Sequence, residues 1–325
     1  MSEINTVLGP ISPDALGVTL PHEHVVAGYA GFDYDPYSRP YNLDKMVQIC
    51  QRALEPAKGY GLNSLVDATP MDLNRDVDLL KAVSEKMQIN IVCATGRYTE
   101  DMGKWTYLKQ RARSKIGDMQ TELYESFMYD ITQGIGKTGV KAGVIKVATG
   151  FDCISACEGA MLRAAARASK ETGLPIITHT ENGTMGPEQV ELLVAEGVNP
   201  KSIMIGHMCG NPSMQYQLAV LNKGVNISFD RFGIEVFQPD KVRLANLIGL
   251  LGIGYTDKIM ISQDFIACGF GRGGVLPEEE RQKVANWSFI NIFRNILPAL
   301  KQAGVTDEQI KTIMVDNPRR LLSGV

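Results

Sequence analysis

The sequence predicts an α/β fold in which eight parallel strands close into a (β/α)8 barrel. Its 325 residues suffice for such a barrel with additions, which needs about 250 residues. A hydrophobic fraction of 44% provides for a large core. Short apolar runs alternate with longer segments of helical character, the pattern of parallel strands covered by helices. We therefore expect one domain over residues 1–325.

Eight apolar runs are the expected strands. Each ends in polar residues or glycine, as strands buried on both faces commonly do. They span residues 17–21, 64–68, 89–94, 143–147, 175–179, 203–207, 225–229 and 259–262. Residues 157–172 illustrate the helical segments between them, because charged residues there interleave with alanine and leucine, and Gly173 follows as a stop signal.

Two connections are unusual for this fold. The third strand-to-helix connection runs from about residue 96 to a helix expected near 120–133, and it carries Tyr98. The eighth, residues 265–277, contains four glycines and can bend over the mouth of a pocket. Long or distinctive connections on such scaffolds usually carry function.

Composition excludes several classes of protein. With a net charge of −3, no basic surface indicates a nucleic acid or an anionic membrane as partner. The amino terminus does not resemble an export signal, and no run approaches the roughly 20 apolar residues of a membrane span. The six cysteines include no C-x-x-C pair. We expect a cytoplasmic protein with reduced thiols, Cys93 and Cys209 among them buried.

All four histidines lie at the ends of expected strands. His22 and His24 are two residues apart where the first strand ends, so their side chains point to the same side of an extended backbone. Alone, such a pair is as easily two satisfied polar residues as two metal ligands. His179 and His207, however, end the fifth and sixth runs. This placement favours one shared site at the carboxyl ends of the strands.

A lysine and an aspartate complete the candidate site. Lys146 lies inside the apolar run 143–147, where a bare ammonium would cost several kcal/mol. Either it pairs with a carboxylate, or it stays neutral and adds carbon dioxide to become a carbamate that bridges two metals. Asp264 follows the eighth run, which is adjacent to the first in a closed barrel, although an aspartate there could also cap a helix.

Together these segments resemble the phosphotriesterase family of the amidohydrolase superfamily, and its lactonase branch in particular. The resemblance covers the whole chain and rests on residues 17–24, 142–146, 175–180, 204–207 and 317–322. It implies two divalent metals, the more buried one held by His22, His24 and Asp264. His179 and His207 would hold the more exposed one. A carboxylated Lys146 and a hydroxide would bridge them, and zinc, iron, cobalt or manganese would serve.

Two further residues match the lactonase branch. Tyr98 corresponds to a tyrosine whose hydroxyl reaches towards the exposed metal, and Arg231 to an arginine after the seventh strand. With Asp264 they form the predicted catalytic set. The alternatives are an ordinary loop tyrosine and a surface arginine paired with Asp230.

The chain also departs from the family pattern. Many relatives carry an aspartate shortly after the ligand equivalent to His207, where this chain has Cys209 and Asn211. Gln263 stands where many relatives have histidine. A proton relay through these positions is therefore in doubt, with water as the alternative carrier.

The resemblance implies a hydrolase that opens lactones, with N-acyl-homoserine lactones as the favoured substrates. Weak phosphotriesterase activity would follow as a by-product. The bridging hydroxide would attack the carbonyl, and Asp264 would carry the proton to the leaving oxygen. Hydrolysis of another carboxyl ester or an amide is the alternative. A barrel that binds metal or a small ligand without turnover is a third, which the presence of all six ligand types opposes. The resemblance also suggests a homodimer.

Overall fold

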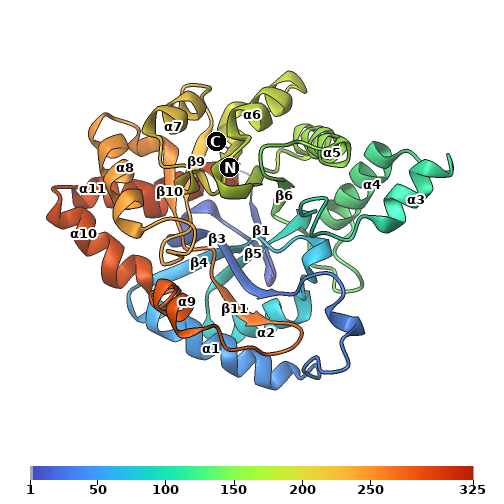
Figure 1. Cartoon of the computed structure of the whole chain (residues 1–325), viewed down its shortest axis with the longest axis horizontal. Coiled ribbons are helices and arrows are strands. Elements are labelled where there is room, and N and C mark those ends of the chain that lie inside the picture. The colour runs from blue at the N-terminus through green and yellow to red at the C-terminus, as the bar shows by residue number, and fades with distance from the viewer. Residues whose placement is uncertain (1–2, 325) are drawn as a thin grey trace.

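The computed structural model describes residues 3–324, in which a ring of parallel strands is surrounded by helices (Figure 1). The predicted (β/α)8 barrel is confirmed. The strands lie in the order β10-β9-β8-β7-β6-β5-β4-β3-β11, and every neighbouring pair is parallel. Their bounds are β3 Val18–Ala27, β4 Leu62–Asp67, β5 Asn90–Gly96, β6 Val144–Thr149, β7 Ile176–Thr180, β8 Ile203–Ile205, β9 Asn226–Phe229, β10 Ile259–Ile261 and β11 Ile266–Gly269.

Helices follow the strands and cover the outside of the ring. The described α-helices are α1 Leu43–Gly59, α2 Val77–Met87, α3 Thr106–Arg113, α4 Met119–Thr132, α5 Ala156–Thr172, α6 Gly186–Ala195, α7 Met214–Leu221, α8 Asp240–Gly252, α9 Glu278–Lys283, α10 Leu297–Gln302, α11 Asp307–Lys311 and α12 Asn317–Ser323. A short hairpin, β1 Ile4–Thr6 and β2 Gly9–Ile11, precedes the barrel. The expected helix at 157–172 is α5, and it ends at Gly173 in the left-handed region.

Two hydrophobic layers hold the barrel together. The inner one gathers inward-facing residues of alternate strand positions, among them Val66, Val144 and Met204. Ile4 and Leu322 join this cluster from the two ends of the described chain. The larger layer fills the space between strands and helices. Since apolar side chains fill the interior, the polar residues at the carboxyl ends of the strands are left to form a site.

The first barrel strand is longer than predicted. It continues to Ala27, so His22 and His24 lie within the strand rather than after it. The strand keeps a partner on both sides, because β4 pairs with one edge and β11 pairs with the other from His24 onward. Its register with β4 shifts between Leu20 and Glu23, an irregularity that re-aims side chains at the ligand positions.

The two unusual connections contain more regular structure than expected. The third includes the helix α3 before α4, and both extend away from the barrel in Figure 1. The eighth begins with the strand β11 instead of a loop. Because β3 extends beyond the end of β10, its backbone groups need a further partner, and β11 supplies it.

The closing segment, which contributed to the family resemblance, acts as a structural clamp. The Asn317 side chain donates hydrogen bonds to the carbonyl oxygens of Thr256 (2.7 Å) and Ile259 (2.6 Å), at the start of β10. Arg319 pairs with Asp14 before the first barrel strand. Among residues 3–324, no helix is both long and apolar enough to cross a membrane.

Candidate metal centre

The structure brings the six predicted ligand side chains together at the carboxyl ends of the strands. Lys146 Nζ lies 2.5 Å from His22 Nε2, and Asp264 Oδ1 lies 3.1 Å from His24 Nε2. The His22 and His207 rings stack at 4.6 Å between centroids. The His179 ring meets His207 edge-on at 4.5 Å. Strands on opposite sides of the ring therefore contribute to one cluster.

A second layer of side chains orients three of the imidazoles. Asp230, directly after β9, lies 2.7 Å from His22 Nδ1 and 2.9 Å from His207 Nδ1. Thr69 Oγ1 lies 2.7 Å from His24 Nδ1. Because each Nδ1 is engaged, the Nε2 atoms of these three rings are left for a metal, the usual arrangement at histidine sites.

The fourth imidazole, His179, is held through Nε2 and not through Nδ1. Glu181 Oε2 lies 2.8 Å from His179 Nε2, which leaves Nδ1 of that ring for a metal. Sequence reasoning missed both Glu181 and Asp230, although signals were available. Glu181 is two residues beyond His179, the spacing that paired His22 with His24. Asp230 follows an apolar run just as Asp264 does.

Two of the candidate ligands have strained backbones. His207 (φ 59°) and Asp264 (φ 53°) occupy the left-handed region, which non-glycine residues adopt at a cost of order 1–3 kcal/mol. Asp264 does not cap a helix, because the element that directly follows it is the strand β11. Such strain persists where surrounding contacts impose it, as is common at functional sites.

Burial holds the imidazoles in the form that binds metals. It lowers the pKa of His179 to about 4, with Glu181 opposing, and it lowers the pKa of His22 and of His207 as well. These three rings are therefore neutral at pH 7, with a lone pair available for a metal.

Lys146 is buried among the imidazoles. Its side chain does not pair with a carboxylate, the first of the two expected arrangements, among the described residues. Its hydrogen-bond partner is His22. Burial lowers its pKa to about 8, although the negative charges of Asp264 and Asp230 oppose that shift. An amine with this pKa is partly unprotonated near neutral pH, and only the unprotonated amine is a nucleophile.

Arg231 is buried and faces Asp264. Its Nε lies 3.2 Å from Asp264 Oδ2, so the alternative of a surface arginine paired with Asp230 is wrong. Burial alone would raise the pKa of Asp264, but His207, His24, His22 and Arg231 bring it well below its ordinary value. Arg231 Nη1 is buried without a partner among the described residues. This atom can donate a hydrogen bond to a ligand in the cavity.

Tyr98 lies beside His179 at one side of the cluster. Its ring meets His179 edge-on at 4.9 Å, and its backbone N–H donates to Asp72 Oδ1 (2.9 Å). Burial raises the pKa of the Tyr98 phenol. The hydroxyl is therefore protonated at neutral pH and can donate a hydrogen bond.

The departures from the family pattern have structural roles or lie away from the cluster. Gln263 is fully buried and donates from Nε2 to Glu23 Oε1 (3.0 Å), while Ile292 N–H donates to its Oε1 (3.2 Å). Cys209 is buried, and Asn211 accepts a hydrogen bond from the backbone of Ser213. Neither Cys209 nor Asn211 belongs to the residues that line the cavity described next.

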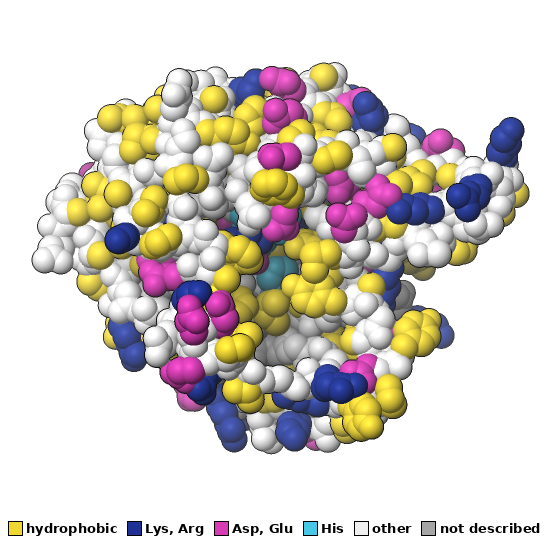
Figure 2. Space-filling view, viewed as in Figure 1, with side chains coloured by type: hydrophobic (Ala, Val, Ile, Leu, Met, Phe, Trp, Pro, Cys, Tyr) yellow, Lys and Arg dark blue, Asp and Glu magenta, His cyan; other side chains and the backbone are white. Residues whose placement is uncertain are grey.

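The cluster lies at the bottom of a cavity of about 510 Å³. Figure 2 shows a hollow near the centre of this face, with histidine at its bottom and hydrophobic side chains around it. The wall is mostly apolar and includes Leu73, Met102, Ile234, Phe237, Ile266, Phe270 and Trp287. The polar bottom and apolar wall suit a ligand with one reactive polar group and a hydrophobic remainder.

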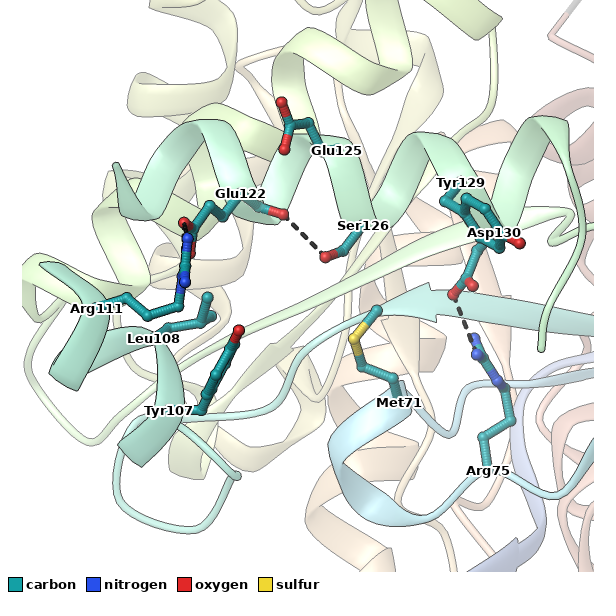
Figure 3. Close-up of a pocket in the computed structure, with 10 residues that line it drawn as sticks. All are labelled: Met71, Arg75, Tyr107, Leu108, Arg111, Glu122, Glu125, Ser126, Tyr129 and Asp130. Atoms are coloured by element: carbon teal, nitrogen blue, oxygen red, sulfur yellow. Dashed lines mark hydrogen bonds and ion pairs between the residues drawn. The ribbon is translucent and has the colours of Figure 1, made fainter. Parts of the chain in front are cut away.

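A second hollow, of about 610 Å³, lies between the segment 71–75 and the helices α3 and α4 (Figure 3). Four of its five charged side chains form pairs, Arg75 with Asp130 at 3.0 Å and Arg111 with Glu122 at 2.7 Å, and Glu125 is the fifth. None of the six candidate metal ligands lines it. The chemistry of the molecule therefore belongs to the first cavity.

The donor set fits divalent metals. Imidazole nitrogen and carboxylate oxygen suit zinc, iron, cobalt and manganese. Donor atoms of His22, His24 and Asp264 all lie within 4.8 Å of one another. The grouping of His22 and His207 with Asp230 is equally compact, but Asp230 binds the Nδ1 atoms on their outer sides. A barrel with this donor set at the carboxyl ends of its strands defines a metal-dependent hydrolase.

Comparison with known proteins agrees with that class. The model of the phosphotriesterase family matches residues 2–322, and the chain belongs to this family. A phosphotriesterase homology protein of Mycobacterium tuberculosis is 36% identical, over 99% of this chain and 98% of the relative.

Solved structures agree closely with the fold. The organophosphorus hydrolase from Deinococcus radiodurans is 42% identical with a TM-score of 0.95, over 98% of this chain and 96% of that one. A structure described as organophosphate hydrolysis activity engineered from a weak promiscuous lactonase template is 40% identical with a TM-score of 0.95, over 99% and 100%.

Proposed function

We propose that this chain is a binuclear metal-dependent lactonase that opens N-acyl-homoserine lactones or related lactones, with weak phosphotriesterase activity as a by-product. The observation that carries the proposal is the convergence of four imidazoles, Lys146 and Asp264 at the bottom of a cavity with an apolar wall. A lactone ring would meet the polar bottom while its acyl chain lies along the wall. The similarity to a promiscuous lactonase template supports this choice.

In the proposed centre, His22, His24 and Asp264 would hold the more buried metal, and His179 and His207 would hold the more exposed one. The orientation of the rings supports metal binding here, since the nitrogens that point away from the cluster already have other partners. A carboxylated Lys146 would bridge the two ions, which its burial and pKa of about 8 favour. The metals would be zinc, iron, cobalt or manganese. Two such ions polarise a carbonyl and supply hydroxide near neutral pH.

The remaining steps fall to the protein's own side chains. The Tyr98 phenol would donate to the lactone carbonyl oxygen and hold the ring in the attacking orientation. Asp264, kept ionised by its cationic neighbours, would accept the proton of the attacking water and deliver it to the departing ring oxygen. Arg231 would keep the Asp264 carboxylate in place through Nε and offer its unpartnered Nη1 to the substrate.

A substrate panel tests this function. Purified, metal-loaded protein is assayed against lactones of varied ring and acyl chain, simple carboxyl esters, N-acyl amides and an activated phosphotriester. We expect kcat/KM to be highest for a lactone and to rise with acyl-chain length. Faster hydrolysis of a simple ester or an amide would assign the chain to that reaction instead. No turnover of any member would point to a barrel that only binds.

We also propose that residues 1–325 act as one domain, as a homodimer, in the cytoplasm. The match of the family model from residue 2 to residue 322 supports one domain, and the family resemblance supports the dimer. Light scattering coupled to gel filtration tests the dimer, since a mass near 35.6 kDa would indicate a monomer.

A further inference from the structure

Two cysteines from distant parts of the chain meet between α1 and β11. Cys50 on α1 is fully buried, and Cys268 on β11 is 7% exposed. The Cys50 thiol lies 3.6 Å from the carbonyl oxygen of Val25, and Cys268 pairs in register with Val26, the next residue of β3. The two thiols therefore lie beside each other, and each influences the ionisation of the other. Both cysteines are free thiols. The fold therefore holds a reduced thiol pair that no step of the hydrolysis uses.

A separate cavity gives access to this pair. It has a volume of about 290 Å³ and is lined by Cys268 together with Arg39, Lys45 and the polar side chains of Tyr41 and Asn42. Arg39 is close enough to act on the Cys268 sulfur, and a cationic side chain near a thiol favours the thiolate and attracts anionic reagents. A small anionic molecule can therefore reach Cys268 without entering the hydrolytic site.

The two thiols differ in reactivity. The hydrogen bond from Cys50 and the positive charge of Arg39 lower the pKa of Cys268 to about 7, although burial opposes this shift. The same hydrogen bond and burial raise the pKa of Cys50. A thiol whose pKa is near the ambient pH is the best attacking group in disulfide exchange. Cys268 is accordingly the reactive sulfur, and Cys50 the second one.

We propose that Cys268 and Cys50 form a redox-active dithiol that small anionic disulfides of the glutathione type convert to an intramolecular disulfide. The Cys268 thiolate attacks one sulfur of the small disulfide and releases one small thiolate, which leaves a mixed disulfide. Cys50 then gives up its proton and attacks the Cys268 sulfur, so that the second small thiol departs. Two protein thiols are oxidised, and one small disulfide is reduced to two thiols.

The cross-link would act next to the substrate cavity. β11 pairs with β3 at His24, and Phe270 directly follows β11. Phe270 lines both the thiol cavity and the substrate cavity, and its ring stacks on Phe32 at 5.0 Å. Tying β11 to α1 would therefore restrain the segment that forms part of the mouth of the substrate cavity.

Peptide mapping of the full-length chain tests the proposal. A Cys153→Ser background removes the exposed thiol, which would otherwise react first. After incubation with oxidised glutathione and alkylation, we expect one linked pair of peptides containing Cys50 and Cys268. Cys50→Ser should stop at a glutathione adduct on Cys268, and Cys268→Ser should form neither product. Cys93→Ser, which removes another buried thiol, should behave as the background does.

A second measurement keeps the test decisive if Cys50→Ser folds poorly. The rate of Cys268 alkylation by iodoacetamide is followed against pH in the background protein and in Arg39→Gln. We expect an inflection near pH 7 that moves upward in Arg39→Gln. The proposal is overturned if both thiols remain free after oxidation, if the parent keeps a lasting adduct on Cys268, or if the link joins other cysteines.

Discussion

Asp230 holds two of the four imidazoles at once, so its effect on metal binding should exceed that of an ordinary hydrogen-bond partner. In Asp230→Asn one carboxylate oxygen becomes an NH2 group, which cannot accept the proton of an Nδ1–H. Loss of such an orienting carboxylate typically weakens metal affinity about 10- to 100-fold. Equilibrium dialysis against a competing chelator measures this. Asp14→Asn, at an exposed ion pair, is the matched control. Equal affinities in both variants would contradict the orienting role.

Substitution of Lys146 tests the proposal that its carbamate bridges the two metals. Lys146→Ala should lose most of the bound metal and most of the activity, because neither ion keeps its shared ligand. A short carboxylic acid added to the solution should restore part of the activity, since its two oxygens can occupy the place of the carbamate. Metal content by elemental analysis and the rate with and without the acid are the measurements. Normal metal content and rate in the variant would show that Lys146 does not bridge.

Substitution of Tyr98 tests the proposal that the substrate is a lactone. The Tyr98 phenol is proposed to orient a lactone carbonyl, which a phosphotriester does not require. Tyr98→Phe should therefore reduce kcat/KM for a lactone more than for an activated phosphotriester. A lost hydrogen bond of roughly 1–3 kcal/mol corresponds to a difference of about 5- to 150-fold. Equal losses for the two substrates would show that Tyr98 only packs against His179.

At the scale of elements, Glu23 on β3 connects this strand to the segment between β10 and β11. Its carboxylate accepts hydrogen bonds from Ser262 Oγ, from the backbone and side chain of Gln263, and from Phe265 N–H. Burial raises the pKa of Glu23, and these donors oppose the shift because they stabilise the ionised carboxylate. These contacts close the ring, because they connect the segment between β10 and β11 to β3.

Glu23→Gln should therefore destabilise the barrel. Its amide would place N–H donors against N–H donors, and a buried donor left without an acceptor costs about 1–3 kcal/mol. Urea unfolding followed by circular dichroism gives the free energy of unfolding. Glu85→Gln, on the exposed face of α2, is the control and should change little. A stability equal to that of the control would mean that Glu23 does not hold the junction.

The elements also show how far local patterns extend. All eight predicted runs became strands, because a strand buried on both faces must be continuously apolar. The continuation of β3 to Ala27 and the strand β11 were missed, since their pairing depends on where the neighbouring strand ends. α3 was missed as well, because its composition is mostly polar and only Leu108 is buried.

At the scale of the whole molecule, the metals are expected to stabilise the fold as well as supply chemistry. The ligands come from strands on opposite sides of the barrel, so bound ions cross-link the ring. A ligand at a hundredfold excess over its Kd stabilises the native state by about 2.7 kcal/mol.

Removal of metal with a chelator should thus lower Tm and abolish hydrolysis, and added metal should restore both. Differential scanning calorimetry measures Tm before and after chelation. Lys146→Ala is the control, because its Tm should respond less to the chelator. Full activity of chelated, metal-free protein would refute the metal-dependent mechanism.

The sequence by itself determined the barrel, the six candidate ligands and the family, since apolar runs and the residues that end them are local properties. Convergence of those ends is a property of every closed parallel barrel. Only the tertiary structure decided which imidazole nitrogens face the centre, that Asp230 and Glu181 hold them, and that Gln263 binds Glu23. It alone also brought Cys50 to Cys268. Except for Glu181 with His179, these contacts join residues far apart in the chain, so they depend on strand register and ring closure, which local patterns do not encode.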